Sequence, residues 1–184
     1  MTVGFYYNME ACVGCKLCMV ACKDRHGLDV QASYRELESF NVGRYPDARI
    51  FHVSMSCNHC ESPACAAACP TGATWQADDG SVQHDDELCI GCQACVNSCP
   101  FGAPDYREDE QLAGKCDSCK PLRDRGEVPM CVAACPLRAI DFGEWDDLSA
   151  AHPDAQQWEG ETGPHYLFSP KPYFDGEGAE AFSY

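Results

Sequence analysis

Large apolar side chains are scarce in this chain. Leu, Ile, Val and Phe together supply 30 of the 184 residues, and the formal net charge is −16 at pH 7. A chain with so few large apolar residues and so much net charge ordinarily buries too little apolar surface to offset the entropy lost on folding. We therefore expect something other than an aliphatic core to hold this fold together.

Long apolar runs are also missing. No stretch is long and apolar enough to cross a bilayer, so we expect no transmembrane segment. The first residues, MTVGFYYNMEACVGC, have neither the basic start nor the apolar centre of a secretory signal. The acidic balance argues against nucleic acid as a partner, because phosphates repel a protein of this charge.

The sequence contains no motif of a common catalytic machinery. We find no Walker loop, no dinucleotide-binding glycine pattern, no GxSxG elbow and no HExxH zinc motif. The six histidines lack metal-like spacing. For His59, which stands between two cysteines, packing or hydrogen bonding is the favoured role. We expect a chain that is not an enzyme on its own.

Cysteine, by contrast, is abundant, and its sixteen residues fall into four runs of four. These are Cys12, Cys15, Cys18 and Cys22; Cys57, Cys60, Cys65 and Cys69; Cys89, Cys92, Cys95 and Cys99; and Cys116, Cys119, Cys131 and Cys135. Disulfides suit secreted chains, and structural zinc favours two CxxC pairs separated by a loop. Both fit these compact runs less well than iron-sulfur clusters do.

The third run carries the sharpest signal. Residues 89–100, CIGCQACVNSCP, match the spacing C-x2-C-x2-C-x3-C-P that holds 4Fe-4S clusters in bacterial ferredoxins. Closely spaced cysteines let one loop wrap three corners of a cluster while backbone N–H groups point at the sulfurs. Gly91 and Ala94 leave room for that wrap. The fourth cysteine follows on a short helical turn, and in two-cluster ferredoxins it binds the neighbouring cluster.

Spacing and pseudo-symmetry give a hypothesis for the ligand sets. The hairpin signal in residues 73–84 joins the second and third runs into one module, which leaves the first and fourth runs as a terminal pair. Exchange of last cysteines then predicts four ligand sets. They are Cys57, Cys60, Cys65 and Cys99; Cys89, Cys92, Cys95 and Cys69; Cys12, Cys15, Cys18 and Cys135; and Cys116, Cys119, Cys131 and Cys22.

The predicted fold class is α+β and loop-rich, with two ferredoxin-like modules that each hold two 4Fe-4S clusters. We divide the chain into residues 1–56 (first run and bridging segment), 57–104 (central module), 105–144 (fourth run) and 145–184 (tail). A compact chain of this length is roughly 40 Å across, so four clusters inside it are near neighbours. The sequence therefore predicts a path for electrons.

Positive charge near the runs has two interpretations. Four lysines flank cysteines and either offset the negative charge of the clusters or lie solvated on the surface: Lys16, Lys23, Lys115 and Lys120. The tail also has two interpretations. It either packs over its own clusters or clamps a larger subunit with its aromatic residues Tyr166, Phe168, Tyr173 and Phe174.

The cysteine segments resemble a known family. SMSCNHCESPACAAACPTGA, CIGCQACVNSCPFGAPDY, KCDSC with PMCVAACPLRAIDFG, and FYYNMEACVGCKLCMVACK are similar to the iron-sulfur subunit of the dimethyl sulfoxide reductase family of molybdopterin enzymes, with the greatest likeness to the subunit serving dimethyl sulfoxide reductase itself. The resemblance covers residues 3 to about 150. It implies the same pairing of runs. Some relatives have tryptophan where Cys92 stands and hold a 3Fe-4S cluster, so cysteine here implies four 4Fe-4S clusters.

The resemblance also implies partners and a place in the cell. The expected partners are a large molybdopterin catalytic subunit, near the cluster of Cys12, Cys15, Cys18 and Cys135, and a membrane anchor or other electron donor near the central module. The expected location is a membrane-associated complex on the extracytoplasmic face, reached by co-export with a signal-bearing partner, with the cytoplasm as the alternative. A free-standing soluble polyferredoxin is the alternative function.

Overall fold

The computed structural model describes residues 2–174 and 179–182. The helices are α1 (Leu17–His26), α2 (Ala64–Ala67), α3 (Ala94–Ser98), α4 (Lys120–Arg123), α5 (Met130–Ala133) and α6 (Trp145–Ala151). The strands are β1 (Val3–Asn8), β2 (Arg35–Val42), β3 (Arg49–Ser56), β4 (Thr74–Gln76), β5 (Val82–His84), β6 (Asp105–Arg107), β7 (Leu112–Gly114), β8 (Ile140–Glu144), β9 (Gln156–Gln157), β10 (Tyr166–Ser169) and β11 (Glu180–Phe182). The expected mixture of strands with few, short helices is confirmed. Within the described ranges, no helix has the length and apolarity that a membrane crossing needs.

A four-stranded sheet joins segments from both halves of the sequence. Its strand order is β8-β1-β10-β9, with β1 antiparallel to β8 and parallel to β10. Phe5 of β1 lies opposite Phe142 on one side and Tyr166 on the other. Tyr166 and Phe168 are buried. Two of the four aromatic residues predicted as a possible clamp are therefore part of this protein's own core.

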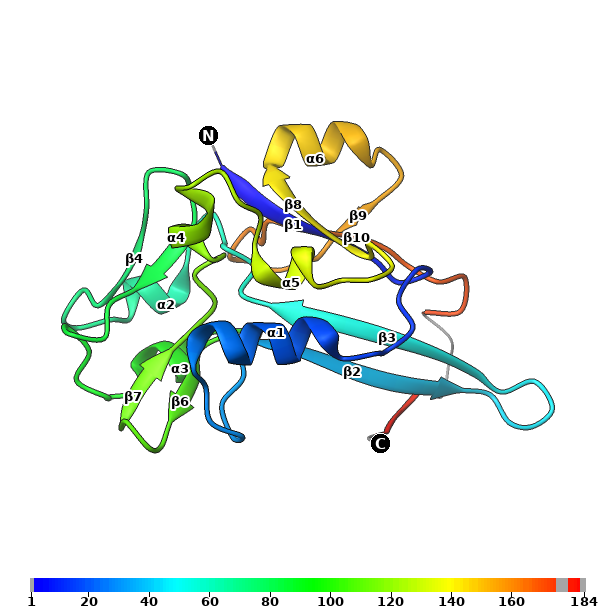
Figure 1. Cartoon of the computed structure of the whole chain (residues 1–184), viewed down its shortest axis with the longest axis horizontal. Coiled ribbons are helices and arrows are strands. Elements are labelled where there is room, and N and C mark those ends of the chain that lie inside the picture. The colour runs from blue at the N-terminus through cyan, green and yellow to red at the C-terminus, as the bar shows by residue number, and fades with distance from the viewer. Residues whose placement is uncertain (1, 175–178, 183–184) are drawn as a thin grey trace.

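A second sheet is built on the long hairpin of β2 and β3, with β11 at its edge. Burial alternates along β2, as expected of a strand with one covered face. Arg35 and Leu37 face inward, whereas Glu36 and Glu38 are exposed on the other face. Helix α1 lies across β2, and the hairpin extends beyond it to the right (Figure 1). The covered face of β2 thus meets the cysteines that α1 carries.

Two small hairpins lie at the left end of the molecule with α2 and α3 (Figure 1). The first pairs β4 with β5, which confirms the hairpin predicted for residues 73–84. Its turn contains Asp79, whose carboxylate accepts hydrogen bonds from the backbone N–H and the hydroxyl of Ser81. The second hairpin pairs β6 with β7 and follows the third run as the first follows the second run.

Four of the helices form within the cysteine runs. The third cysteine of each run lies in a helix: Cys18 in α1, Cys65 in α2, Cys95 in α3 and Cys131 in α5. In three runs a proline follows the fourth cysteine, and the helix has ended by then because proline disfavours helical geometry at the preceding residue. In the first run Lys23 stands in that place, and α1 continues to Gly27, a left-handed residue that caps it.

Cysteines make up much of the hydrophobic core. Phe5, Tyr7 and Met9 of the first strand and its following turn are buried together with eight cysteines from all four runs. The small number of large aliphatic residues is therefore consistent with a core organised around sulfur. We infer that this core depends on what the thiols bind, because metal ligation contributes directly to the folding free energy of small domains.

Candidate metal centre

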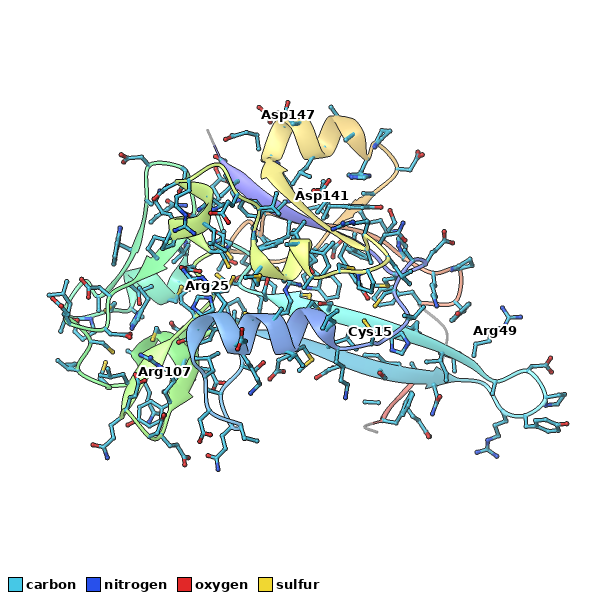
Figure 2. All side chains as sticks on the ribbon, in the orientation of Figure 1. Cys15, Arg25, Arg49, Arg107, Asp141 and Asp147 are labelled. Atoms are coloured by element: carbon cyan, nitrogen blue, oxygen red, sulfur yellow. The ribbon has the colours of Figure 1, made fainter. Side chains whose placement is uncertain are left out.

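The sixteen cysteines are all free thiols in this structure, and their burial follows a pattern. Ten are buried and four are half-buried. Only Cys15, in the loop ahead of α1 (Figure 2), and Cys92, ahead of α3, are exposed. Both are second cysteines, one in the first run and one in the third. Thiols buried without disulfide partners are what a set of metal ligands requires.

Four cysteines of two different runs surround one small enclosed cavity. Cys57, Cys60 and Cys65 come from the second run, and Cys99 comes from the third. This is one of the four sets that the sequence predicts. Pro100 and Phe101, which follow Cys99, close another part of the wall. Helices α2 and α3 pack against each other here, which brings the two runs together.

A buried amide shows that the cavity suits an iron-sulfur cluster. Asn58 lines the cavity, is 1 % exposed, and neither amide atom has a hydrogen-bond partner among the described residues. A buried polar group without a partner is costly. Cluster sulfurs accept hydrogen bonds, so a cluster on these four cysteines gives the Asn58 N–H group an acceptor. The ligand chemistry and the unpaired donor therefore both fit a 4Fe-4S cluster.

A second meeting of runs involves α1 and α5, which pack against each other. Burial raises the pKa of Cys22 to about 12, and the negative charges of Cys131 and Cys119 contribute to that rise. Burial also raises the pKa of Cys116 well above its ordinary value, with Cys22 as the strongest charged contributor. The last cysteine of the first run thus lies among the first three cysteines of the fourth run.

The same electrostatic relationship links the third run to the second. Burial raises the pKa of Cys95, and the charges of Cys89 and Cys69 contribute. In the remaining predicted set, Cys12 contributes to the raised pKa of Cys18, for which burial is again the main cause. The four ligand sets, including the places of Cys15, Cys92 and Cys135 in them, stay predictions.

Backbone N–H groups point at cysteine sulfurs, as the sequence predicts. Ala103 donates to Cys99 Sγ at 3.4 Å, and Ala139 donates to Cys135 Sγ at 3.2 Å, each from four residues further along. Backbone N–H groups that include Ala73 lower the pKa of Cys69 although burial raises it. The repeated signal CPTGA, CPFGA and CPLRA, which cysteine spacing alone does not reveal, marks these loops in the sequence. It supplies anion-stabilising donors to the last cysteine of three runs.

The loop between the first and second cysteines also repeats. Its residue just before the second cysteine has a positive φ in every run, at Gly14, His59, Gly91 and Ser118. Two of the four are not glycine, although this left-handed region favours glycine. A shared backbone turn therefore shapes all four loops, which the spacing predicts but the residue types only half reveal.

His59 combines this unusual backbone with complete burial. Its Nδ1 accepts a hydrogen bond from the backbone N–H of Val82 at 2.9 Å. Burial lowers the pKa of His59 well below its ordinary value, so the ring is neutral and carries its proton on Nε2. That atom lies 3.9 Å from Cys116 Sγ. The predicted packing and hydrogen-bonding role of His59 is confirmed.

The flanking lysines behave differently from one another. Lys115 is 4 % exposed, and its ammonium donates to the carbonyls of Val82 and Cys116, so the interpretation of a solvated lysine is wrong there. Lys23 donates to three carbonyls in residues 29–32 and fixes that loop. Lys120 forms a partly exposed pair with Asp124.

The tail packs over the second cysteine run. Thr162 donates from its hydroxyl to Cys60 Sγ at 3.2 Å, and its carbonyl accepts from Ser62 N–H. His165 N–H donates to the carbonyl of Asn58. Of the two interpretations of the tail, the structure supports the one in which it covers its own cysteines. Tyr173 and Phe174 stay half-buried beside Phe51.

Comparison with known proteins finds iron-sulfur proteins. Two models described as a 4Fe-4S dicluster domain match, one over residues 48–145 and one over residues 11–73. The protein is 41 % identical over 159 residues to the B subunit of anaerobic dimethyl sulfoxide reductase from Escherichia coli, which covers 82 % of this protein and 78 % of that subunit. It is 40 % identical over 154 residues to the corresponding B subunit from Haemophilus influenzae, covering 79 % and 75 %.

A third relative has a lower sequence identity to this protein. Protein NrfC of Escherichia coli is 35 % identical over 147 residues, covering 78 % of this protein and 66 % of that one. The two dicluster matches and sixteen cysteines support four 4Fe-4S clusters as the cofactors. With both models and the curated relatives in agreement, the protein belongs to the iron-sulfur subunits of the dimethyl sulfoxide reductase family.

Proposed function

We propose that this protein is a non-catalytic electron-transfer subunit that relays electrons between a donor and a molybdopterin-containing catalytic subunit. The observation that carries the proposal is the cavity shared by Cys57, Cys60, Cys65 and Cys99, in which the second run receives the last cysteine of the third. A 4Fe-4S cluster supplies a one-electron redox centre when bound. The protein's part is to hold such centres close together and away from water.

The proposed ligand sets follow the exchange of last cysteines in both pairs of runs, with two clusters in each ferredoxin-like module. The influence of both Cys22 and Cys57 on Cys116 supports a junction between the modules, because Cys22 belongs to the terminal pair and Cys57 to the central module. The two sets that contain no exposed cysteine then lie in the middle of a row of four clusters. The outer sets contain the exposed Cys15 and Cys92.

The exposed cysteines suit the two ends of an electron path. Cys15 precedes α1, whose start lies right of centre, whereas Cys92 precedes α3 at the left end (Figures 1 and 2). Electron transfer to another protein needs a redox centre near the surface. We propose that the catalytic subunit docks near the set of Cys12, Cys15, Cys18 and Cys135, and that the donor docks near the set of Cys69, Cys89, Cys92 and Cys95.

The nature of the partners rests on the relatives. The B subunit of anaerobic dimethyl sulfoxide reductase is by its name one part of a larger enzyme. We propose a large molybdopterin subunit and a membrane-anchor subunit or other donor for this protein, in a membrane-associated complex on the extracytoplasmic face. The proposed division into residues 1–56, 57–104, 105–144 and 145–184 keeps the tail as a further contact with the catalytic subunit through Tyr173 and Phe174.

Anaerobic isolation of the undissociated protein tests the proposal. Iron, labile sulfide, molybdenum and tungsten are determined together with the masses of all co-purifying polypeptides. We expect about sixteen irons per polypeptide and a large partner that contains molybdenum or tungsten. The same iron content without a partner indicates a free polyferredoxin. Absence of labile sulfide contradicts iron-sulfur clusters altogether.

A further inference from the structure

Arg35 is a cation that the fold has buried almost completely. It opens β2, is 1 % exposed, and extends its guanidinium toward β3. Nη1 donates to Ser54 Oγ at 3.1 Å, and Nη2 donates to Ser56 Oγ at 2.8 Å. Nε has no hydrogen-bond partner among the described residues. Two neutral hydroxyls do not compensate a buried positive charge.

Two other arginines with little solvent exposure have carboxylate partners. Arg107 pairs with Asp86 and Glu110, and Arg123 pairs with Asp79. Among the described residues, none of the ion pairs includes Arg35. A buried arginine without a carboxylate needs another anion, because an isolated charge is strongly disfavoured inside a protein.

The groups near Arg35 that become anions on deprotonation or metal binding are cysteine thiols and one phenol. Cys131, Cys18 and Cys116 are the thiols whose negative charge acts on the guanidinium most strongly. The phenol of Tyr166 also lies close, and the guanidinium stacks over the ring of Phe5 at 4.8 Å. All three cysteines belong to the proposed ligand sets of the terminal pair of runs. Arg35 therefore lies beside cysteines of both proposed ligand sets of that pair.

Ser54 connects Arg35 to one ligand directly. Its hydroxyl is fully buried, accepts the hydrogen bond from Arg35, and lies 3.8 Å from Cys18 Sγ. A hydroxyl has a single proton, and with Arg35 as its donor that proton is free to point at Cys18. Hydrogen bonds and positive charge near cluster sulfurs favour the reduced, more negative state.

We propose that Arg35 raises the reduction potentials of the two clusters held by the terminal pair of runs, by its charge on both and through Ser54 on the cluster that Cys18 binds. This inference rests on the proposed function, since it requires clusters on those cysteines. Arg35 is a tuning residue and touches no substrate. Its effect draws electrons toward the end of the molecule that carries Cys12 and Cys15.

Redox titration of the anaerobically purified complex, followed by electron paramagnetic resonance, tests the inference. The variants are Arg35→Gln, which keeps hydrogen-bond donors but loses the charge, Arg35→Lys, which keeps the charge, and Ser54→Ala. Arg49→Gln is the matched control, because Arg49 is exposed on β3 near the hairpin turn (Figure 2). Signals are assigned by replacing one cysteine of each ligand set in turn, and iron and labile sulfide are measured for every variant.

With full iron content, we expect Arg35→Gln to shift both terminal-pair potentials downward, by more than the central-module potentials and more than in Arg49→Gln. Arg35→Lys stays close to wild type, and Ser54→Ala lowers only the potential of the cluster bound by Cys18. Loss of iron from the terminal pair in Arg35→Gln but not in Arg35→Lys also supports the inference, because the charge is then needed for assembly.

Two results overturn it. One is Arg35→Gln with full iron and terminal-pair potentials that move no more than in Arg49→Gln. The other is equal loss of iron in Arg35→Gln and Arg35→Lys, which makes the guanidinium a packing group. The wild-type protein separates this failure from that of the proposed function: if it lacks four clusters, the proposed function fails, and if it holds four, only the inference about Arg35 fails.

Discussion

His59 Nε2 lies 3.9 Å from Cys116 Sγ, at the proposed junction between the two modules. His59 belongs to the second run, and Cys116 opens the fourth. The Val82 N–H group holds the ring by Nδ1, so the proton on Nε2 faces the sulfur. A single buried ring therefore connects the second cysteine run to the first cysteine of the fourth run.

Replacing His59 tests this junction. His59→Leu leaves the buried Val82 N–H without its acceptor, so we expect a loss of about 1–3 kcal/mol of stability. The measurement is the temperature at which the cluster absorbance is lost under anaerobic conditions. His152→Leu is the control, because His152 stacks on Tyr6 away from the cysteine runs. If both variants lose their clusters at the wild-type temperature, the His59 contacts do not contribute measurably to stability.

Gly91 tests the close packing of the cluster loops. It has φ +67°, and a Cβ atom there would lie 2.2 Å from the backbone oxygen of Gln111. Gly91→Ala therefore requires movement of the backbone of the β6–β7 hairpin as well as left-handed strain. Gly126→Ala is matched, since its φ is +79° and nothing lies within 4 Å of the added atom.

The two glycine variants should differ in iron content. We expect Gly91→Ala to lose the cluster of the third run, whereas Gly126→Ala keeps full iron and loses only about 1–2 kcal/mol through left-handed strain. Iron and labile sulfide per polypeptide provide the comparison. Equal iron in both variants would mean that the loop around Gly91 accommodates the added Cβ atom without losing its cluster.

Cys92 tests the proposed ligand sets at their exposed end. Cys92→Ser should convert one cluster to 3Fe-4S or lose it, because three thiolates then remain for four irons. Electron paramagnetic resonance of the oxidised protein detects the 3Fe-4S product. Four intact clusters with unchanged spectra would refute the assignment of Cys92. Ser98→Ala in the same run leaves the cysteines in place and should keep all four.

Asp79 and Arg123 test the hairpin that separates the second and third runs. Burial raises the pKa of Asp79, but hydrogen bonds from Ser81 and Arg123 outweigh burial and lower the pKa to about 2. A carboxyl whose folded pKa is depressed stabilises the fold above its unfolded pKa of about 4, and that contribution disappears as the pH falls toward 2. Its contribution is therefore constant between pH 5 and 8.

Asp79→Asn should lower the anaerobic melting temperature by an amount equivalent to about 1 kcal/mol, since the pair is partly exposed. The difference from wild type should be the same at pH 5.5 and at pH 8. Glu127→Gln breaks a solvent-exposed pair with Arg125 and should have no measurable effect. A deficit of Asp79→Asn that vanishes at pH 5.5 would contradict the depressed pKa.

Local patterns revealed the cysteine runs and the hairpin of residues 74–84. Cluster ligands and tight turns are specified by residue type at short spacing, so a sequence shows them directly. The repeated C-P-x-G/R-A loop was not among the sequence predictions, because it is visible only when the residues after the fourth cysteines are compared; Arg138 replaces the glycine of the other two loops there, at a positive φ.

Strand pairing between distant segments could not be predicted from local patterns. The tail forms β10 beside β1, more than 150 residues away, and its prolines and glycines conceal the four-residue strand YLFS. Such pairing is decided by packing between distant segments. The inward face of β2 was also missed, because an arginine in a sequence indicates a surface position, whereas Arg35 is 1 % exposed.

Native mass spectrometry of the anaerobically purified protein weighs the clusters that the polypeptide holds and so decides whether all sixteen cysteines serve as cluster ligands. We expect a mass above that of the polypeptide equal to four Fe4S4 units, reduced by one cluster or one iron in Cys92→Ser. A protein that carries two clusters, or zinc in place of iron and sulfide, would contradict the four ligand sets and the electron path built on them.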